Sequence, residues 1–376
     1  MKKRNFIILI LAGILNNTSW FVLLPLLPPH ILKSTGSEML TGIVMGSASL
    51  LTVIFRQQIG VFIQRIGTKK LMVAGLFGNT IGILLFPYSN SFLTLLFSRT
   101  LQGSGLIIYF FSALNMITMI LPEERRGELF GLYSTVFIIP LLYAPILGSW
   151  LSGRFSFQII TIFSTSLAVI VLPLILALKE PKDRLNPEAA SFKGLKIRKL
   201  APPLAAVFFI IFADATIVSF LSLAAAKKSI KNFSFFFTFF ATSTILIRLI
   251  LGRVFDRKSR KLIVVLGLMT AAVGVFFLSF LSFPFLIVAG LIYGAGFGIS
   301  DSNIYPLLMK NCGKEFEAAS ATLYSMVFDS AHLIAPPLMG FIAGVSSFRL
   351  MFLTASALIV FASINLLFFK TSERKT

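Results

Sequence analysis

A succession of long apolar stretches constrains this chain more than any other feature. Each stretch holds about 20 residues, the length of helix that crosses the ~30 Å hydrocarbon core of a bilayer. The chain has 376 residues, 56% of them hydrophobic and 13% charged, and a mean hydropathy of +0.90. These values exclude an ordinary soluble domain, so we predict an all-α membrane protein. Twelve transmembrane helices are predicted, at residues 6–27, 39–61, 71–88, 91–119, 129–151, 156–178, 201–226, 233–255, 262–281, 284–309, 317–345 and 349–369.

The formal net charge of +20 does not indicate a nucleic-acid partner, because the basic residues alternate between the two sides of the spans. With the N-terminus in the cytoplasm, 25 of the 34 Lys and Arg residues fall on the inner side, six on the outer side and three within spans. The outer six are Lys33, Arg154, Lys227, Lys228, Lys231 and Arg349. This is the positive-inside distribution, and it predicts a multi-pass protein of the cell membrane with both termini in the cytoplasm.

The second half of the chain repeats the first. The segment Leu132 to Gly148 and the segment Leu323 to Met339 share nine of 17 residues at an offset of 191. At the same offset LQGSG, from Leu101, corresponds to IYGAG, from Ile292. Six spans followed by a related six predict two pseudo-symmetric six-helix bundles with a cavity between them. We place the bundles at residues 1–178 and 201–376, joined by a polar cytoplasmic linker at 179–200.

A glycine followed by basic residues also occurs once in each half, as GVFIQRIGTK from Gly60 and GRVFDRKSRK from Gly252. The glycine lets neighbouring helices approach closely, and the basic residues lie at headgroup level. The acid of this pattern is present only in the second copy. We therefore expect a conformational latch between helices that is weaker in the first half, formed by Gly60, Gln64, Arg65, Gly252, Asp256 and Arg257.

In these patterns the chain resembles the major facilitator superfamily over essentially its whole length. The loop signature G-x-x-x-D-R-x-G-R-K of that family is matched in both halves, with Gln64 in place of the acid in the first and Ser259 in place of a glycine in the second. The fourth-helix signature is matched at Arg99, Gln102, Gly103 and Gly105. The fifth-helix antiporter signature is matched at Gly131, Pro145 and Gly148, while Pro140 and Ala144 replace two glycines. The resemblance implies the major facilitator fold and favours the drug:proton antiporter (multidrug efflux) subgroup.

Three acids lie inside predicted spans, and all three are in the second half: Asp214, Asp301 and Asp329. A charge at bilayer depth costs at least ~2.5–3.5 kcal/mol, so each acid needs a partner, a water-filled cavity or a functional role. His332 follows Asp329 by three residues and shares its helix face. We predict that these four residues couple transport to protons. The alternative is a satisfied polar pair that braces a helix contact.

Three arginines also lie inside spans. Arg56 and Arg248 occupy equivalent positions, so we expect a structural role for both, reaching the inner headgroups or bracing the loop. Arg99 has Gly290 as its counterpart and is expected to hold an anionic group as a fixed positive charge. The alternative is that amides such as Asn16 and Asn17 satisfy it.

The predicted substrate cavity combines polar and aromatic residues of the spans that carry the signatures. Its predicted members are Asn16, Trp20, Arg99, Gln102, Tyr109, Tyr293 and Tyr305. The phenylalanine-rich run Phe233 to Phe240 is expected to face lipid.

Motifs for nucleotide or hydrolytic chemistry, such as GxxxxGK[ST], HExxH and GxSxG, do not occur, and the chain has one cysteine. We therefore predict a transporter that is not an enzyme and uses no metal and no cofactor. Its expected partners are protons, a small-molecule substrate and the lipid bilayer, and it is expected to be a monomer. The leading function is a proton-coupled exporter of a small organic solute or drug that works by alternating access. The alternatives are a proton symporter or facilitator for a small, possibly anionic metabolite, and a non-transporting receptor or scaffold. A membrane-embedded enzyme ranks below these.

Overall fold

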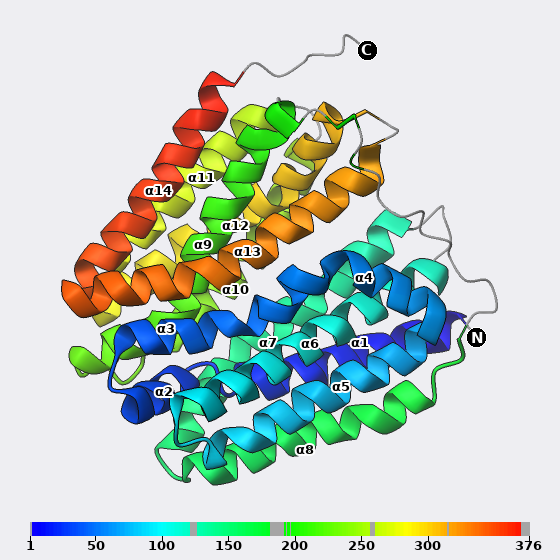
Figure 1. The fold of residues 1–376 in the computed structure, drawn as a ribbon. Coiled ribbons are helices and arrows are strands. Elements are labelled where there is room, and N and C mark those ends of the chain that lie inside the picture. Colours follow the sequence, from blue (N-terminus) through cyan, green and yellow to red (C-terminus); the bar gives the residue numbers. More distant parts are fainter. Residues whose placement is uncertain are drawn as a thin grey trace. The chain divides into compact units, whose positions relative to one another are not determined.

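The computed structural model describes residues 2–120, 126–180, 192, 194–195, 197–255, 260–313 and 316–369. All regular structure in these residues is helical (Figure 1). The chain forms two compact units. Unit 1 comprises Met1–Gly36 and Ile43–Ala189, and unit 2 comprises Ser37–Gly42 and Ala190–Thr376.

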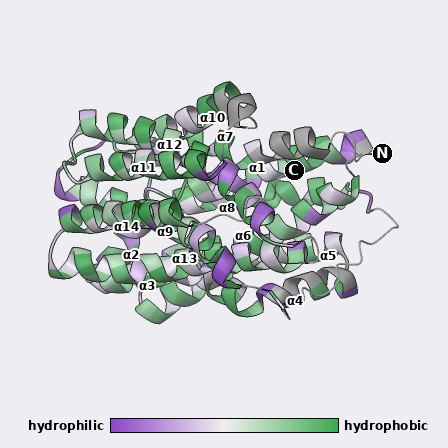
Figure 2. Cartoon of the chain, turned by 90° about the horizontal axis from the view of Figure 1, so that it is seen from above, coloured by the Kyte–Doolittle hydropathy of each residue, from purple (hydrophilic) through white to green (hydrophobic). Residues whose placement is uncertain are grey.

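The first part of the chain forms α1 (Lys2–Phe21), α2 (Leu27–Thr35), α3 (Glu38–Gly46), η1 (Ser47–Ser49), α4 (Leu50–Ile66), α5 (Thr68–Leu85), η2 (Phe86–Tyr88), α6 (Phe92–Ile120), α7 (Arg126–Ser152) and α8 (Phe157–Leu176). The second part forms α9 (Ile197–Lys227), α10 (Phe235–Phe255), α11 (Arg260–Leu278), α12 (Phe283–Asn311), α13 (Glu317–Val345) and α14 (Phe348–Phe368). Hydrophobic residues cover most of these helices, and hydrophilic ones interrupt them at separate points (Figure 2).

Ten segments of the described chain are long and apolar enough to cross a membrane, and Phe235–Ile250 is a shorter apolar helix. The first predicted span is not among the ten. Here α1 ends at Phe21, where the predicted helix continued to residue 27. Pro25 has no backbone N–H to donate, and Pro28 and Pro29 start the separate helix α2. The predicted span 39–61 is also divided, by η1 and by non-helical backbone at Phe55 within α4.

The two units repeat one set of helix pairings. In unit 1, α1 packs on α7 and α8, and α5 packs on α6 and α8. In unit 2, α9 packs on α13 and α14, and α11 packs on α12 and α14. Local chemistry repeats as well, because α8 and α14 both begin after a serine whose hydroxyl caps the first turn. Ser156 accepts from Ile159 N at 3.4 Å, and Ser347 accepts from Leu350 N at 3.2 Å.

Glycines allow the closest of these contacts. A Cβ on Gly105 of α6 would lie less than 3.0 Å from backbone atoms of α5, and a Cβ on Gly296 of α12 would meet α11 in the same way. Because no larger residue fits at either position, the α5–α6 and α11–α12 pairs are held backbone against backbone. These glycines are the last residues of LQGSG and IYGAG, so the sequence repeat marks a packing repeat.

Candidate functional site

A chain of buried polar side chains connects three helices of unit 1. Arg99 Nη1 donates to Gln102 Oε1 on α6. Gln102 Nε2 donates to Asn79 Oδ1 on α5 at 3.0 Å, and Asn79 Nδ2 donates to Asn16 Oδ1 on α1 at 3.1 Å. The guanidinium of Arg99 also lies 4.0 Å from the centre of the Trp20 ring. We call these five residues the Arg99 chain.

The Arg99 chain has spare hydrogen-bonding capacity. Arg99 is 6% exposed and Asn16 fully buried, yet Arg99 Nε and Asn16 Nδ2 have no hydrogen-bond partner in the described part of the chain. Nor does any described acidic side chain pair with Arg99. Asn17, the other expected partner, instead donates to the backbone oxygens of Gly13 and Val136. The Arg99 chain thus presents a buried positive charge and unused hydrogen-bond donors. These features suit the binding of an anionic or carbonyl-rich group.

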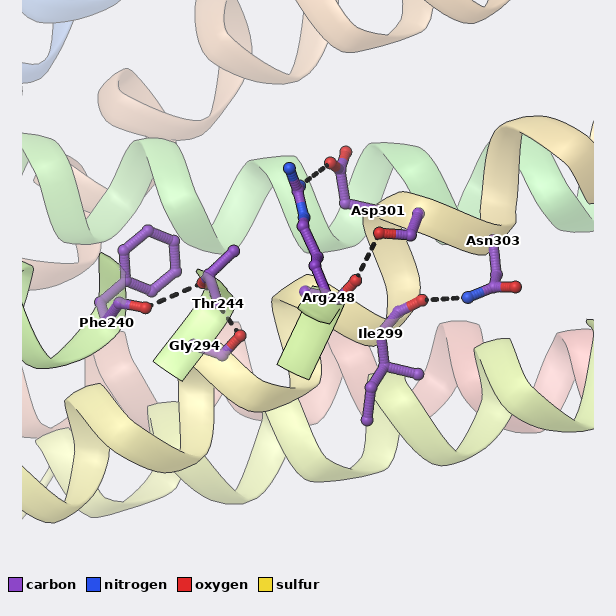
Figure 3. A network of polar contacts seen from close by, with 9 residues as sticks. Phe240, Thr244, Arg248, Gly294, Ile299, Asp301 and Asn303 are labelled. Carbon is purple, nitrogen blue, oxygen red and sulfur yellow. Dashed lines mark hydrogen bonds and ion pairs between the residues drawn. The ribbon is translucent and has the colours of Figure 1, made fainter. Parts of the chain in front are cut away.

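Unit 2 carries a group of charged side chains on three helices, and Figure 3 shows two of them, Arg248 and Asp301. Arg248 of α10 donates to Asp301 of α12 at 2.6 Å, and the two side chains are 26% and 32% exposed. Asp214 of α9 is partly buried and lies close enough to Asp301 for the two carboxylates to interact. Tyr293 of α12 lies beside Asp214, and its hydroxyl donates to Ile210 O at 3.5 Å. We call Asp214, Arg248, Tyr293 and Asp301 the carboxylate group.

Within the described residues, Arg248 forms an ion pair with Asp301, and no ion pair to Asp214 occurs. The equivalent Arg56 in unit 1 lies instead over the ring of Phe111, 3.8 Å from its centre. Arg248 therefore contacts a carboxylate, and Arg56 contacts an aromatic ring. The salt bridge gives Arg248 a partner within unit 2, and its expected structural role, at the headgroups or bracing the loop, stays a prediction.

The other predicted site residues are placed as follows. Asp329 is 5% exposed on α13, and a ring nitrogen of His332, one turn later, lies 3.3 Å from Phe328 O. Pairing between Asp329 and His332 stays a prediction. Tyr109 is buried in unit 1, and its hydroxyl has no partner among the described residues. Tyr305 is 40% exposed and meets the ring of Tyr324 edge-on.

The phenylalanine-rich run does not simply face lipid. Phe236, Phe237 and Phe240 are at most 8% exposed, and the rings of Phe236 and Phe240 stack with Tyr293. The prediction that this run faces lipid is therefore wrong for Phe236, Phe237 and Phe240. Gly290 and Gly294 on α12 allow the backbone of α10 near Phe236 and Phe240 to approach closely.

The loop and antiporter signatures are only partly described. Gly60, Gln64 and Arg65 fall in α4, Gly252 falls in α10, and Arg65 is exposed. Asp256 and Arg257 lie outside the described residues, so the latch stays a prediction. Gly131 and Pro145 fall in α7. A Cβ on Gly148 would collide with Val22 O, so this glycine permits close packing of α7 against the end of α1.

The sequence did not predict the capping role of two signature lysines. Lys69 Nζ donates to Leu176 O and Leu178 O at the end of α8, and Lys261 Nζ donates to Phe369 O at the end of α14. These lysines are equivalent in the repeat, so each loop signature caps the last helix of its own half. Asn79 was missed as well, although a lone amide in an apolar span is a signal for a buried polar contact.

Comparison with known proteins supplies the family context. The model of the Major Facilitator Superfamily matches residues 9–336. The inner membrane transport protein YajR of Escherichia coli is 28% identical over 191 residues, 49% of this chain and 40% of that protein. The staphylopine export protein of Staphylococcus aureus is 32% identical over 137 residues, 36% of this chain and 34% of that protein. The alignments thus span about two fifths or less of these relatives.

Among solved structures, the nucleoside transporter NupG is similar in fold over 96% of this chain and 99% of its own. The TM-score is 0.81 and the sequence identity 12%. At this identity the likeness concerns the fold alone.

Proposed function

Since this chain belongs to the major facilitator superfamily, we propose that it is a proton-coupled exporter of a small organic solute. In this proposal twelve helices form two six-helix bundles, at residues 1–178 and 201–376, that alternate access to a central site. The protein lies in the cell membrane as a monomer with both termini in the cytoplasm.

The carboxylate group carries the proposal. Asp214 and Asp301 lie close together on spanning helices, and within the described residues Arg248 pairs with Asp301 while Asp214 has no ion pair. Two carboxylates with one positive charge leave an excess negative charge, which is costly inside the membrane. Binding one proton removes that excess, and release of the proton becomes favourable when water or a cationic solute reaches the group. A change of access can therefore change the proton occupancy, which is the requirement for coupling.

Two observations favour export over import. The antiporter signature is present at Gly131, Pro145 and Gly148, and Gly148 lies at a tight contact of α7. A relative that shares 32% identity over part of its length is named as an export protein. We further propose that Asp329 and His332 contribute to proton coupling and that Trp20, Tyr109, Tyr293 and Tyr305 contribute to the substrate cavity.

The test is proton movement in liposomes that contain the purified protein and an internal pH-sensitive dye. Organic cations, organic anions, sugars and nucleosides are added outside one class at a time. An exchanger moves protons against the direction of its solute, and Asp214→Asn and Asp301→Asn each abolish that proton movement. Protons and solute moving together support a symporter, solute movement that ignores a pH gradient supports a facilitator, and no flux with any class supports a receptor or scaffold.

A second candidate, a symporter or facilitator for an anionic metabolite, is favoured by the Arg99 chain. Arg99 is buried without an acidic partner in the described part of the chain, so a solute carboxylate or phosphate would complete it. In the same liposomes, Arg99→Gln then abolishes flux of organic anions. If Arg99→Gln leaves anion flux unchanged, this candidate is rejected.

A further inference from the structure

A groove on unit 2 lies outside both polar clusters. It has a volume of about 420 Å³ and lies between α9 and α14, which pack side by side (Figure 1). Its lining residues are Pro202, Phe361, Ile364, Asn365, Phe368 and Phe369. Five of the six are apolar, and none is charged. The volume lies within the ~300–1,000 Å³ range of ordinary ligand pockets.

Pro202 lines the groove together with Phe368 and Phe369, while Phe209, two turns further along α9, meets the ring of Phe361 at 6.0 Å. The two helices therefore run antiparallel. The open end of the groove lies where α9 begins and α14 ends, which the proposed topology places on the cytoplasmic side.

Basic side chains surround the open end. Arg198 and Lys199 are exposed and precede Pro202 by four and three residues, so they lie on the same face of α9. Helical side chains lean towards the N-terminus, which directs both cations to the surface side of the groove. Lys261 adds a third positive charge, because its Nζ donates to Phe369 O at 2.5 Å. None of the described residues that line the groove is acidic.

Asn365 is the polar member of the lining. It is exposed on α14, one turn before Phe369, and no hydrogen bond to it occurs within the described residues. At ~1.5 Å per residue it lies about 6 Å along the helix axis from Phe369, at the end of the groove. An exposed amide there is costly against hydrocarbon and favourable against ester carbonyl groups.

From these features we propose that the groove is a binding site for one anionic phospholipid. An acyl chain lies along Phe361, Ile364 and Phe368, the Asn365 amide donates to an ester carbonyl, and Arg198 and Lys199 bind the phosphate. The three basic side chains favour an anionic headgroup over a zwitterionic one. A zwitterionic headgroup brings its own cationic group close to these side chains, which repel it.

Native mass spectrometry of the purified full chain tests the site. The protein is titrated with phosphatidylglycerol and with phosphatidylcholine of the same acyl chains. Phosphatidylglycerol is expected to bind more tightly, and Arg198→Gln/Lys199→Gln is expected to weaken it about 25-fold, at about fivefold per charge. Binding of phosphatidylcholine should weaken by less in the double variant, because its choline group offsets the charge of the phosphate.

The matched control is Lys3→Gln/Lys70→Gln, which removes two exposed charges from unit 1. It should leave phosphatidylglycerol affinity within twofold. Ile364→Trp fills the groove with every charge intact, and it should weaken both lipids. The proposal is overturned by equal affinity for the two lipids, by equal weakening in the control, or by unchanged binding to Ile364→Trp. Gel filtration confirms that each variant is folded, and Asn365→Leu supplies a second test within the groove.

Discussion

At the scale of single residues, the two halves differ most at one pair of equivalent arginines. Arg56 rests on the ring of Phe111, whereas Arg248 binds Asp301 in a partly exposed salt bridge. The repeat aligns Asp301 with Phe110, so the second half has gained a carboxylate where the first half is aromatic. The arginine is thus common to both halves, whereas its carboxylate partner occurs in the second half.

Removing one member of that salt bridge should cost more than removing both. Arg248→Gln leaves Asp301 without its cation and Asp301→Asn leaves Arg248 without its direct carboxylate partner, whereas the double variant removes both members of the bridge. We expect the double variant to recover part of the lost Tm, with a coupling of about 0.5–3 kcal/mol in a double-mutant cycle. We expect no transport by either single variant or by the double variant.

The Lys227–Glu38 salt bridge of unit 2 is a matched control, because its lysine side chain is 60% exposed. Its coupling should be about 0–1 kcal/mol. Strictly additive losses at Arg248 and Asp301 would contradict a direct interaction between them.

A second residue-scale prediction concerns Asn79. Asn79→Ala leaves the buried amides of Gln102 and Asn16 without a common partner, at about 1–3 kcal/mol for each unsatisfied group. Thermal unfolding in detergent should show a Tm lower by several degrees. Thr80→Ala on the same helix is the control, since Thr80 donates only to Leu76 O of its own helix. A similar Tm for the two variants would argue against the Arg99 chain as a stabilising unit.

At the scale of helices, the glycine contacts lead to a prediction about both halves. Gly105→Ala and Gly296→Ala each place a methyl group within 3.0 Å of backbone in the next helix, where no side chain can move aside. Both variants should lose most of their folded protein in fluorescence-detected gel filtration. Gly153→Ala should not, because its nearest neighbour would lie 3.7 Å away. Normal yield of either contact variant would mean that the helix pair can separate without loss.

Helix existence was predictable from the sequence, and helix interruption was not. Hydropathy places α6 and α13 within one residue of their observed ends, because length and apolar composition decide those spans. It misses the break after Phe21 and the η1 segment, where prolines and serines redirect backbone hydrogen bonds within a continuous apolar run. It also misses Asn79, because partners in different helices are set by packing.

For the site, the sequence supplied the charges and the structure supplied their partners. Asp301 and Arg248 were both visible as charges in spans, and nothing in their spacing of 53 residues indicated a salt bridge. Likewise the hydrophobicity of Phe236 and Phe240 suits lipid and protein equally well. Only the neighbouring helix, with Tyr293 and two glycines, decides that they are buried.

At the scale of the whole molecule, the single cysteine reports the proposed orientation. Cys312 is partly exposed at the end of α12, on the side proposed to face the cytoplasm. A membrane-impermeant maleimide should label inside-out vesicles and leave right-side-out vesicles unlabelled. Cys312→Ser should remove the signal. In that background Lys228→Cys, at an exposed position beyond α9, should give the opposite result. Labelling of Cys312 from outside would reverse the proposed topology.

Several hydrogen bonds hold the end of α8 to other helices of unit 1. These bonds bear on where the polypeptide can be cut into two fragments. Arg4 and Lys69 donate to backbone oxygens at the end of α8, Asn5 exchanges hydrogen bonds with Lys179, and Glu180 accepts from Thr68 N. Every one of these bonds lies inside unit 1. A gene split just after this anchor would therefore encode a first fragment whose final helix is already fastened to its own first and third spans, and co-expression of the two fragments should reconstitute a working carrier.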